Sequence, residues 1–249
     1  MKFFSITPLA FIDYSSIILP SLEYVYKTSQ RFKIDNSHNE KHSLEVLYWS
    51  TQIMKSLKED KPFTQSEMNV ILQSTILHDM CDRKYKLENN LKSIEEHLKQ
   101  NHPSTREIKA IIDIITTMSY SKTFVDEKIV YPSWINNSTY QRSYHVTREA
   151  DLLASYNIAR MIDFRQRSNY SQDEIIEETT FLYNTRIEKL VERGLFYHKR
   201  SQEIAKNLEA VSHYKMTTLK NYKLDKDLDY LKIIDYISLD NLIAEINKI

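Results

Sequence analysis

The chain has 249 residues, with 34 basic and 34 acidic side chains and therefore no formal net charge. This balance gives no sign of a polyanionic partner, so we do not expect a nucleic-acid-binding protein. A single cysteine, Cys81, excludes an internal disulfide and a cysteine-rich zinc site, and agrees with a reducing, cytoplasmic setting. The one glycine, Gly194, is too few for a phosphate-binding loop or a dinucleotide fold.

The N-terminal stretch 1–20 is apolar but interrupted by Thr7, Pro8 and Asp13. A secretory signal needs an uninterrupted apolar core and a cleavage site of small residues, so we do not expect one here. No stretch of the chain approaches the roughly 20 apolar residues of a membrane span, so we expect no membrane partner.

Four segments further along fit the capping box that opens many helices. In this motif a Ser or Thr side chain accepts a hydrogen bond from a free backbone N–H, and a later Glu reaches back. Apolar residues at helical spacing follow each segment, which predicts four helices. The segments are SHNE (37–40), TQSE (64–67), STRE (104–107) and SQDE (171–174).

Further helices are expected from apolar periodicity near 15–31, 86–100, 143–167, 199–222 and 226–247. Residues 124–141 have no helical period and are predicted to form a long ordered loop, and Gly194 is a natural helix stop. The pattern predicts an all-α protein with one main domain over 1–198 and a helical C-terminal extension over 199–249 that packs on the same domain.

Imidazole and carboxylate groups recur on three of these predicted helices. His78 and Asp79 lie where the helix from about residue 65 ends, His42 lies near the start of the helix after SHNE, and Asp151 lies among apolar residues of a later helix. Two imidazoles and two carboxylates form a borderline-hard ligand set suited to Mn²⁺, Fe²⁺, Co²⁺, Ni²⁺ or Zn²⁺. The three segments that carry these residues are far apart in sequence, so the alternative that His78 is a hydrogen-bonded core histidine stays open at this point.

The order of these residues resembles the HD superfamily of metal-dependent phosphohydrolases over about residues 35–165. The similar segments are SHNEKHSLEV (37–46), LHDMCDRKY (77–85), IIDIITTMSYSK (111–122) and READLLASYNIAR (148–160). They are also similar to HD proteins carried by some large DNA viruses. The resemblance implies an HD-type, phosphodiesterase-like helical bundle with additional C-terminal helices.

The resemblance also implies an activity and a ligand set. His42, His78, Asp79 and Asp151 would hold one divalent metal ion, with Mn, Co, Ni, Fe, Zn and Mg all open. The expected reaction is hydrolysis of a small phosphorylated substrate, a nucleotide first among them, by metal-activated water. Whether the bond is a phosphomonoester, phosphodiester or phosphoanhydride is not resolved.

Other residues near these motifs are candidates for catalysis and substrate binding. Asp79 or Asp82 would position the water or relay its proton. Cations for the phosphate would come from Arg83, Lys84 and Lys122, and His145 is a candidate lining residue. His145 lies six residues before Asp151, about 120° away around a straight helix, so we do not expect it to be a ligand.

Two other functions remain open from the sequence. One is a non-catalytic HD-type module that binds nucleotides or other molecules. The other is a di-iron HD oxygenase, which would need additional histidine ligands. The oligomeric state is also open, with a homodimer as one option.

Overall fold

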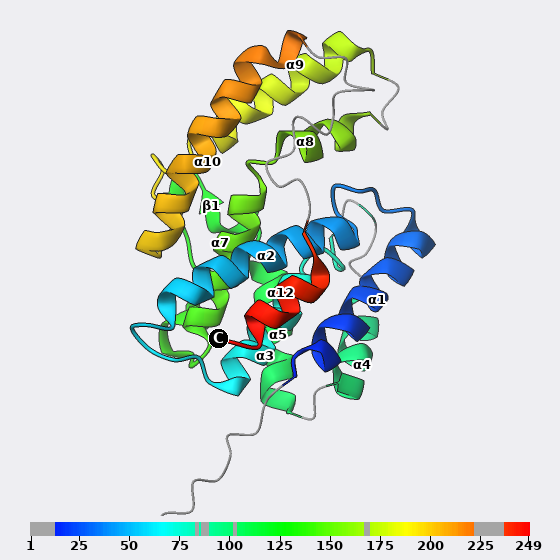
Figure 1. The fold of residues 1–249 in the computed structure, drawn as a ribbon, viewed down its shortest axis with the longest axis vertical. Coiled ribbons are helices and arrows are strands. Elements are labelled where there is room, and N and C mark those ends of the chain that lie inside the picture. The colour runs from blue at the N-terminus through cyan, green and yellow to red at the C-terminus, as the bar shows by residue number, and fades with distance from the viewer. Residues whose placement is uncertain (1–12, 83–84, 86–89, 102–103, 167–169, 222–236) are drawn as a thin grey trace, which may run out of the picture.

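The computed structural model describes residues 13–82, 85, 90–101, 104–166, 170–221 and 237–249. These residues form an all-α fold, as predicted, with one short β-hairpin (Figure 1). The first elements are α1 Ser15–Phe32, α2 Glu40–Leu57, α3 Gln65–Leu77, α4 Leu91–Asn101, α5 Thr105–Thr117 and α6 Tyr120–Thr123. There follow β1 Phe124–Val125, β2 Lys128–Ile129, η3 Ser133–Asn137, α7 Gln141–Ala154, α8 Ile158–Arg165, α9 Gln172–Leu182, η4 Tyr183–Ile187, α10 Lys199–Thr218, η5 Leu219–Asn221 and α12 Leu239–Ile246.

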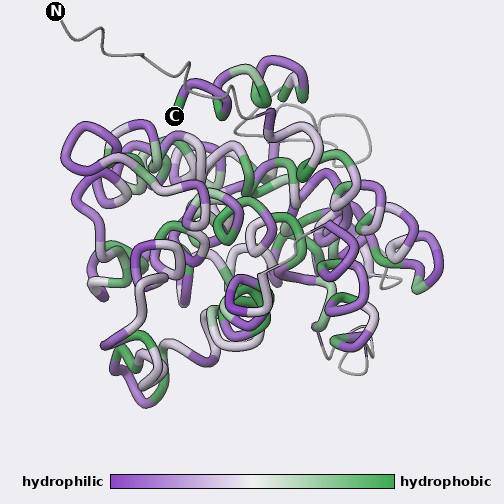
Figure 2. Tube along the Cα trace, turned by 90° about the horizontal axis from the view of Figure 1, so that it is seen from below, coloured by the Kyte–Doolittle hydropathy of each residue, from purple (hydrophilic) through white to green (hydrophobic). Residues whose placement is uncertain are grey.

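The helix α3 lies at the centre of the bundle, in contact with α1, α2, α5 and α7. It is buried on all sides from Glu67 to Leu77 except at Asn69, which explains why its apolar residues do not keep to one face. Some buried polar residues of α3 form hydrogen bonds to neighbouring helices. For example, the hydroxyl of Ser21 in α1 donates to Oε1 of Gln73 at 2.7 Å. The tube in Figure 2 shows hydrophobic positions where the helices face one another.

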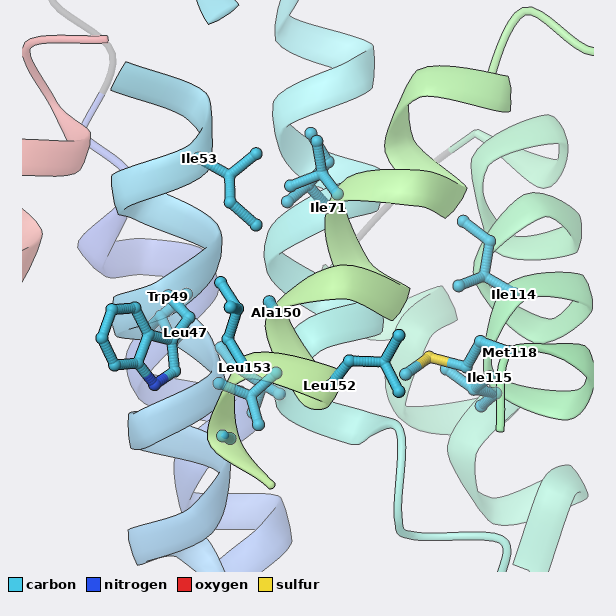
Figure 3. Packing of buried hydrophobic residues seen from close by; sticks show 14 of the residues in the cluster. Leu47, Trp49, Ile53, Ile71, Ile114, Ile115, Met118, Ala150, Leu152 and Leu153 are labelled. Atoms are coloured by element: carbon cyan, nitrogen blue, oxygen red, sulfur yellow. The ribbon is translucent and has the colours of Figure 1, made fainter. Parts of the chain in front are cut away.

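The helix α7 packs against α2 and α3 and completes the core. Figure 3 shows Leu153 directed towards α2, while Leu152 points towards Met118, the residue that follows α5. All of these side chains are almost fully buried. Burial of one Leu or Ile side chain stabilises a fold by about 1.5–3 kcal/mol, so this packing holds the three helices in a fixed arrangement.

The capping boxes predicted at Thr64 and Ser171 are confirmed, with both reciprocal hydrogen bonds present. Ser104 also caps α5 by accepting from the backbone N–H of Glu107. At SHNE a helix is present as predicted, but Ser37 is not its N-cap. The helix α2 begins at Glu40, two residues later than it would if Ser37 were the cap. Asn39 is the N-cap and accepts from the N–H of Lys41, while Ser37 is held by Asp35.

The predicted helix 143–167 is broken into α7 and α8. Residues 155–157 form the break, and Asn157 takes an extended conformation at the start of α8. Asn157 donates from Nδ2 to both carboxylate oxygens of the buried Glu45 at 3.1 Å. This side-chain bond to α2 fixes the turn between the two helices and directs α8 back over α2.

The segment 124–141, predicted as a loop, contains the β1–β2 hairpin and the 3₁₀ turn η3. After η4, a series of turns ends at Gly194, whose φ is 67°, and the N–H of Leu195 bonds to the carbonyl of Leu190. The helix α10 then packs against α7, and α12 packs against α2. The expected helix 226–247 is represented by α12, since residues 222–236 lie outside the described part.

No described helix combines the length and the apolar character that crossing a membrane requires. Residues 1–12 lie outside the described part, so the expectation about a secretory signal stays a prediction.

Candidate metal centre

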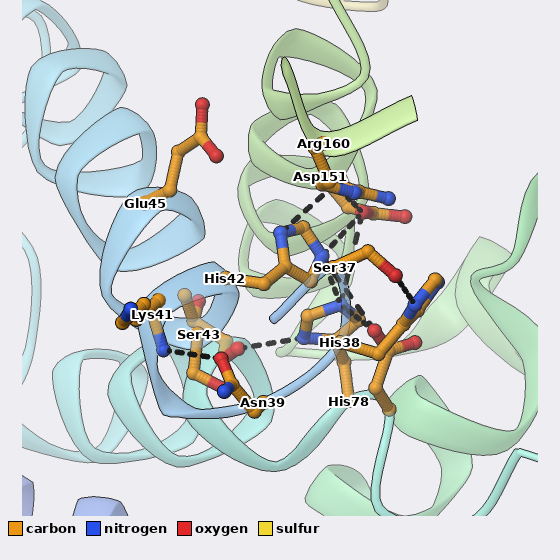
Figure 4. Close-up of polar contacts among 12 residues, drawn as sticks. Ser37, His38, Asn39, Lys41, His42, Ser43, Glu45, His78, Asp151 and Arg160 are labelled. Carbon is orange, nitrogen blue, oxygen red and sulfur yellow. Dashed lines mark hydrogen bonds and ion pairs between the residues drawn. The ribbon is translucent and has the colours of Figure 1, made fainter. Parts of the chain in front are cut away.

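Three helices bring the predicted ligand residues together at one end of the central helix. His42 lies in the first turn of α2, His78 is the C-cap residue directly after α3, and Asp151 lies in the last turn of α7. Ser43 donates to the carbonyl of Ile76 at 2.8 Å, which fastens the start of α2 to the end of α3. This bond sets His42 directly beside His78 (Figure 4).

Four donor atoms converge between these side chains. Nε2 of His42 and Nε2 of His78 lie 3.2 Å apart. Oδ2 of Asp79 lies 3.3 Å from Nε2 of His78 and 3.6 Å from Nε2 of His42. Oδ1 of Asp151 lies 3.4 Å from Nε2 of His42 and 3.7 Å from Nε2 of His78. The arrangement places two nitrogens and two oxygens around one point.

These separations are close to those expected around a shared metal ion. Two ligand atoms about 2.1 Å from one ion lie roughly 3.0–3.4 Å apart at octahedral or tetrahedral angles. Three of the five separations lie in this range, and the other two, 3.6 and 3.7 Å, are slightly longer. Oδ2 of Asp79 is buried and makes no hydrogen bond to any described residue, so this oxygen is available to coordinate a metal ion. His42, His78 and Asp151 thus form a group that could hold a metal ion, and no other such group occurs in the described part.

His78 is oriented for this task by the backbone. Its Nδ1 donates to the carbonyl of Thr75 at 2.8 Å, which turns Nε2 towards the other donors. Burial alone would lower the pKa of His78, but the carboxylates of Asp79 and Asp151 outweigh it and raise this pKa to about 9. Burial likewise opposes ionisation of Asp79, yet His78 and His38 hold the pKa of Asp79 well below its usual value.

His42 has a different partner on its second ring nitrogen. Nη1 of Arg160 donates to Nδ1 of His42 at 2.8 Å, and Nη1 also lies 3.9 Å from Oδ1 of Asp151. Burial and the charge of Arg160 lower the pKa of His42 to about 3, so this imidazole is neutral at pH 7. Because the guanidinium can only donate, Nδ1 of His42 is the acceptor of this bond.

A pocket of about 740 Å³ opens beside the ligand residues. His78, Asp79 and Asp151 form one part of its lining, and Asp82 and Lys122 also line it. The remaining lining residues combine apolar and hydroxyl side chains: Cys81, Leu91, Ile115, Thr116, Met118, Ser119 and Ser121. The predicted residues Arg83 and Lys84 lie outside the described residues.

His145 does not lie in the lining of this pocket. Its ring stacks on that of Tyr197 with centroids 4.0 Å apart, and burial lowers its pKa to about 4. The neighbouring Glu149 accepts from the N–H groups of Tyr197 and His198 at the start of α10. This side of α7 therefore connects α7 to α10 and faces away from Asp151.

Two residues near the centre were missed by sequence reasoning. Arg160 lies nine residues after Asp151, on the opposite side of a straight helix, and only the break before α8 brings it back. His38 lies in the turn before α2, four residues before His42, and the centroid of its ring is 5.9 Å from that of His42. A second histidine so close to His42 in the sequence could have indicated His38, whereas no feature of the sequence indicated Arg160.

Comparisons with known proteins identify no relative. The chain matches no family model, no curated protein and no solved structure. The helical fold and the His-His-Asp group are compatible with an HD domain.

Proposed function

We propose that this protein is an HD-type metal-dependent phosphohydrolase that acts on a small phosphorylated molecule. The observation that carries the proposal is the convergence of four donor atoms, on His42, His78, Asp79 and Asp151, at the edge of a pocket of about 740 Å³. Imidazole and carboxylate groups that converge in a largely buried site are typical of metal sites in enzymes.

In this proposal His42, His78, Asp79 and Asp151 hold one divalent ion. Such an ion supplies a bound water of lowered pKa and polarises a phosphoryl oxygen. The backbone carbonyl of Thr75 keeps His78 in the orientation that the site needs. Asp82 also lines the pocket, and in this proposal it accepts a proton from the attacking water.

The pocket lining supports a substrate with both a phosphoryl group and an apolar part. Lys122, Ser119 and Ser121 offer a positive charge and hydroxyl groups to phosphoryl oxygens. Ile115 and Met118 belong to the same lining and offer an apolar wall. A nucleotide combines these two features, so nucleotides are the first substrates to test.

The decisive experiment compares the wild type with Asp79→Ala and with the control Asp113→Ala. Asp113 lies on α5 and pairs with Lys109 outside the pocket lining. We would quantify bound metal and assay a nucleotide panel with Mn²⁺, Co²⁺, Ni²⁺ and Mg²⁺. The proposal expects about one metal ion per chain and hydrolysis in the wild type and the control, with both lost in Asp79→Ala.

Other outcomes would point to the alternatives. Nucleotide that binds without turnover under any metal would favour a non-catalytic binding module. About two irons per chain, with oxidation of an organic substrate, would favour a di-iron oxygenase. Equal metal content in the wild type and Asp79→Ala would mean that the His78–Asp79 pair is structural.

A further inference from the structure

Tyr120 is held by two arginines that follow α9 in the chain. Nη1 of Arg193 donates to the hydroxyl of Tyr120 at 3.0 Å, and Cζ of Arg186 lies 4.0 Å from the centroid of the Tyr120 ring. Cζ of Arg193 also lies 4.9 Å from the centroid of the Phe124 ring. Tyr120, Arg186 and Arg193 together form a contact between α6 and the segment after α9, which we call the Tyr120 clamp.

The Tyr120 clamp lies directly beside residues that line the candidate pocket. Ser119 and Ser121, the two neighbours of Tyr120, line this pocket, and so does Lys122. Tyr120 itself is not part of the lining, and its ring is turned to the arginines. The helix α6 has only four residues, and a helix of this length depends on tertiary contacts for its stability. The position of this pocket wall therefore depends on contacts such as those of Tyr120.

The two arginines are themselves held in fixed positions. Nη1 of Arg193 also donates to the carbonyl of Thr185 at 3.1 Å, so one guanidinium joins Tyr120 to η4. The first and last residues of η4, Tyr183 and Ile187, are almost fully buried and anchor this turn in the core. The element η4 is a π-helical turn, and such turns are frequent at functional sites.

Lys122 is the charged residue whose position the clamp would control. Its backbone N–H donates to the carbonyl of Ser119 at 3.0 Å, and its Nζ donates to the carbonyl of Thr116. Both acceptors belong to residues of the same pocket wall. Lysine has a long and flexible side chain, so its ammonium group is placed accurately only where the backbone is fixed. A shift of Tyr120 would move the backbone of Lys122 with it.

We propose that Arg193 and Arg186 are positioning residues for substrate binding, which act through Tyr120 on the pocket wall that carries Lys122. The inference rests on the proposed function, which assigns the binding of a phosphoryl group to this wall. Neither guanidinium lines the pocket, so neither contacts the substrate in this proposal. Loss of either arginine should therefore weaken phosphoryl binding and leave the bound metal in place.

The test measures binding of methylphosphonate, a stable phosphoryl probe, by titration calorimetry in the presence of Mn²⁺. The variants are Arg193→Met, Arg186→Met and Tyr120→Phe, each alone and combined with Lys122→Gln. The control is Arg106→Met, because Arg106 likewise donates to a hydroxyl and lies near a tyrosine ring, but outside the pocket lining. Metal content and thermal melting of each variant show whether the centre and the fold are intact.

We expect Arg193→Met and Arg186→Met each to weaken methylphosphonate binding about fivefold, with unchanged metal content. Tyr120→Phe should reproduce the effect of Arg193→Met, because it removes the same hydrogen bond. In the Lys122→Gln background the further loss from Arg193→Met should be about twofold or less, since a positioning residue has little effect once the group that it positions is absent. The control variant should change binding by less than about twofold.

A loss from Arg193→Met that is equally large in the Lys122→Gln background would overturn the proposal, because the clamp would then act on the fold in general. Full binding in Arg193→Met and Arg186→Met would also overturn it, as would a wild type that binds no methylphosphonate. If Arg193→Met does not fold, Tyr120→Phe decides, since it removes a single hydroxyl group.

The proposed function can fail separately from the clamp. A wild type that binds methylphosphonate but hydrolyses no nucleotide with any of the metals would contradict the phosphohydrolase proposal. The clamp would then still be supported or overturned by the binding data for Arg193→Met with and without Lys122→Gln.

Discussion

His42 and His78 face each other with their Nε2 atoms 3.2 Å apart, but their other ring nitrogens have opposite partners. Nδ1 of His78 donates to the carbonyl of Thr75, whereas Nδ1 of His42 accepts from Arg160. The bond to Thr75 therefore holds His78 with its Nε2 facing the other donor atoms. Coordination of a metal ion through Nε2 of His42 would require the ring proton on Nδ1, the nitrogen that now accepts from Arg160, so Arg160 would have to move.

Metal should stabilise the fold measurably. A ligand present at about 100 times its Kd raises the free energy of unfolding by about 2.7 kcal/mol, which is about 5–10 °C in Tm for a chain of this size. We expect Mn²⁺ or Co²⁺ to raise the Tm of the wild type and EDTA to reverse the rise. Asp151→Asn should abolish the shift and Asp113→Asn should retain it. An equal shift in both variants would place the ion elsewhere.

Lys122 should affect substrate binding more than the chemical step. Its side chain is exposed at the pocket and donates to the carbonyl of Thr116, so its loss should leave the fold intact. We expect Lys122→Gln to raise KM about tenfold with a smaller change in kcat and unchanged metal content. Lys128→Gln, on the exposed hairpin, is the matched control. A fall in kcat at constant KM would instead assign Lys122 to the transition state.

Glu45 should make stability fall as the pH rises. Burial raises its pKa from the usual 4.5 to about 7 in the folded protein. The folded state therefore holds a proton that the unfolded state releases. This contribution is fully present below pH 4.5 and is lost as the pH rises through 7.

Glu45→Gln should accordingly raise the free energy of unfolding by roughly 1–3 kcal/mol at pH 8 and by much less at pH 4.5. Urea titrations at both pH values would measure the difference. The exposed Glu59→Gln is the control and should show no such contrast. A variant that is less stable than the wild type at pH 8 would mean that the ionised Glu45 is needed there, as a partner of Arg160.

Glu149 should be a major contributor to stability, because it caps α10 from the neighbouring helix. Its buried carboxylate accepts from two backbone N–H groups at the start of α10 and pairs with His198 at 3.0 Å. We expect Glu149→Gln to lower the free energy of unfolding by about 2–4 kcal/mol, as for other broken buried ion pairs. Denaturant unfolding measures this, with the exposed Glu203→Gln as a control. A loss below about 0.5 kcal/mol would show that the cap is dispensable.

Local chemistry in the sequence was enough to predict most helices and their starts. The boxes at Thr64 and Ser171 depend on residues three positions apart, so they can be read without knowledge of the fold. Four polar residues stand out in the sequence against the apolar helical positions around them: His42, His78, Asp79 and Asp151. In the structure their side chains lie close together, as a shared metal site would require. The all-α class followed from the same periodicity together with the lack of glycine.

The surroundings of the centre were decided by tertiary contacts. The bond from Asn157 to Glu45 breaks the expected helix 143–167 and turns Arg160 towards His42, although a continuous helix would direct it away. His145 is drawn to Tyr197 by the packing of α10 and so lies outside the pocket lining. Periodicity determines which residues share a helical face, but the direction of the next helix depends on side-chain bonds between segments more than one hundred residues apart.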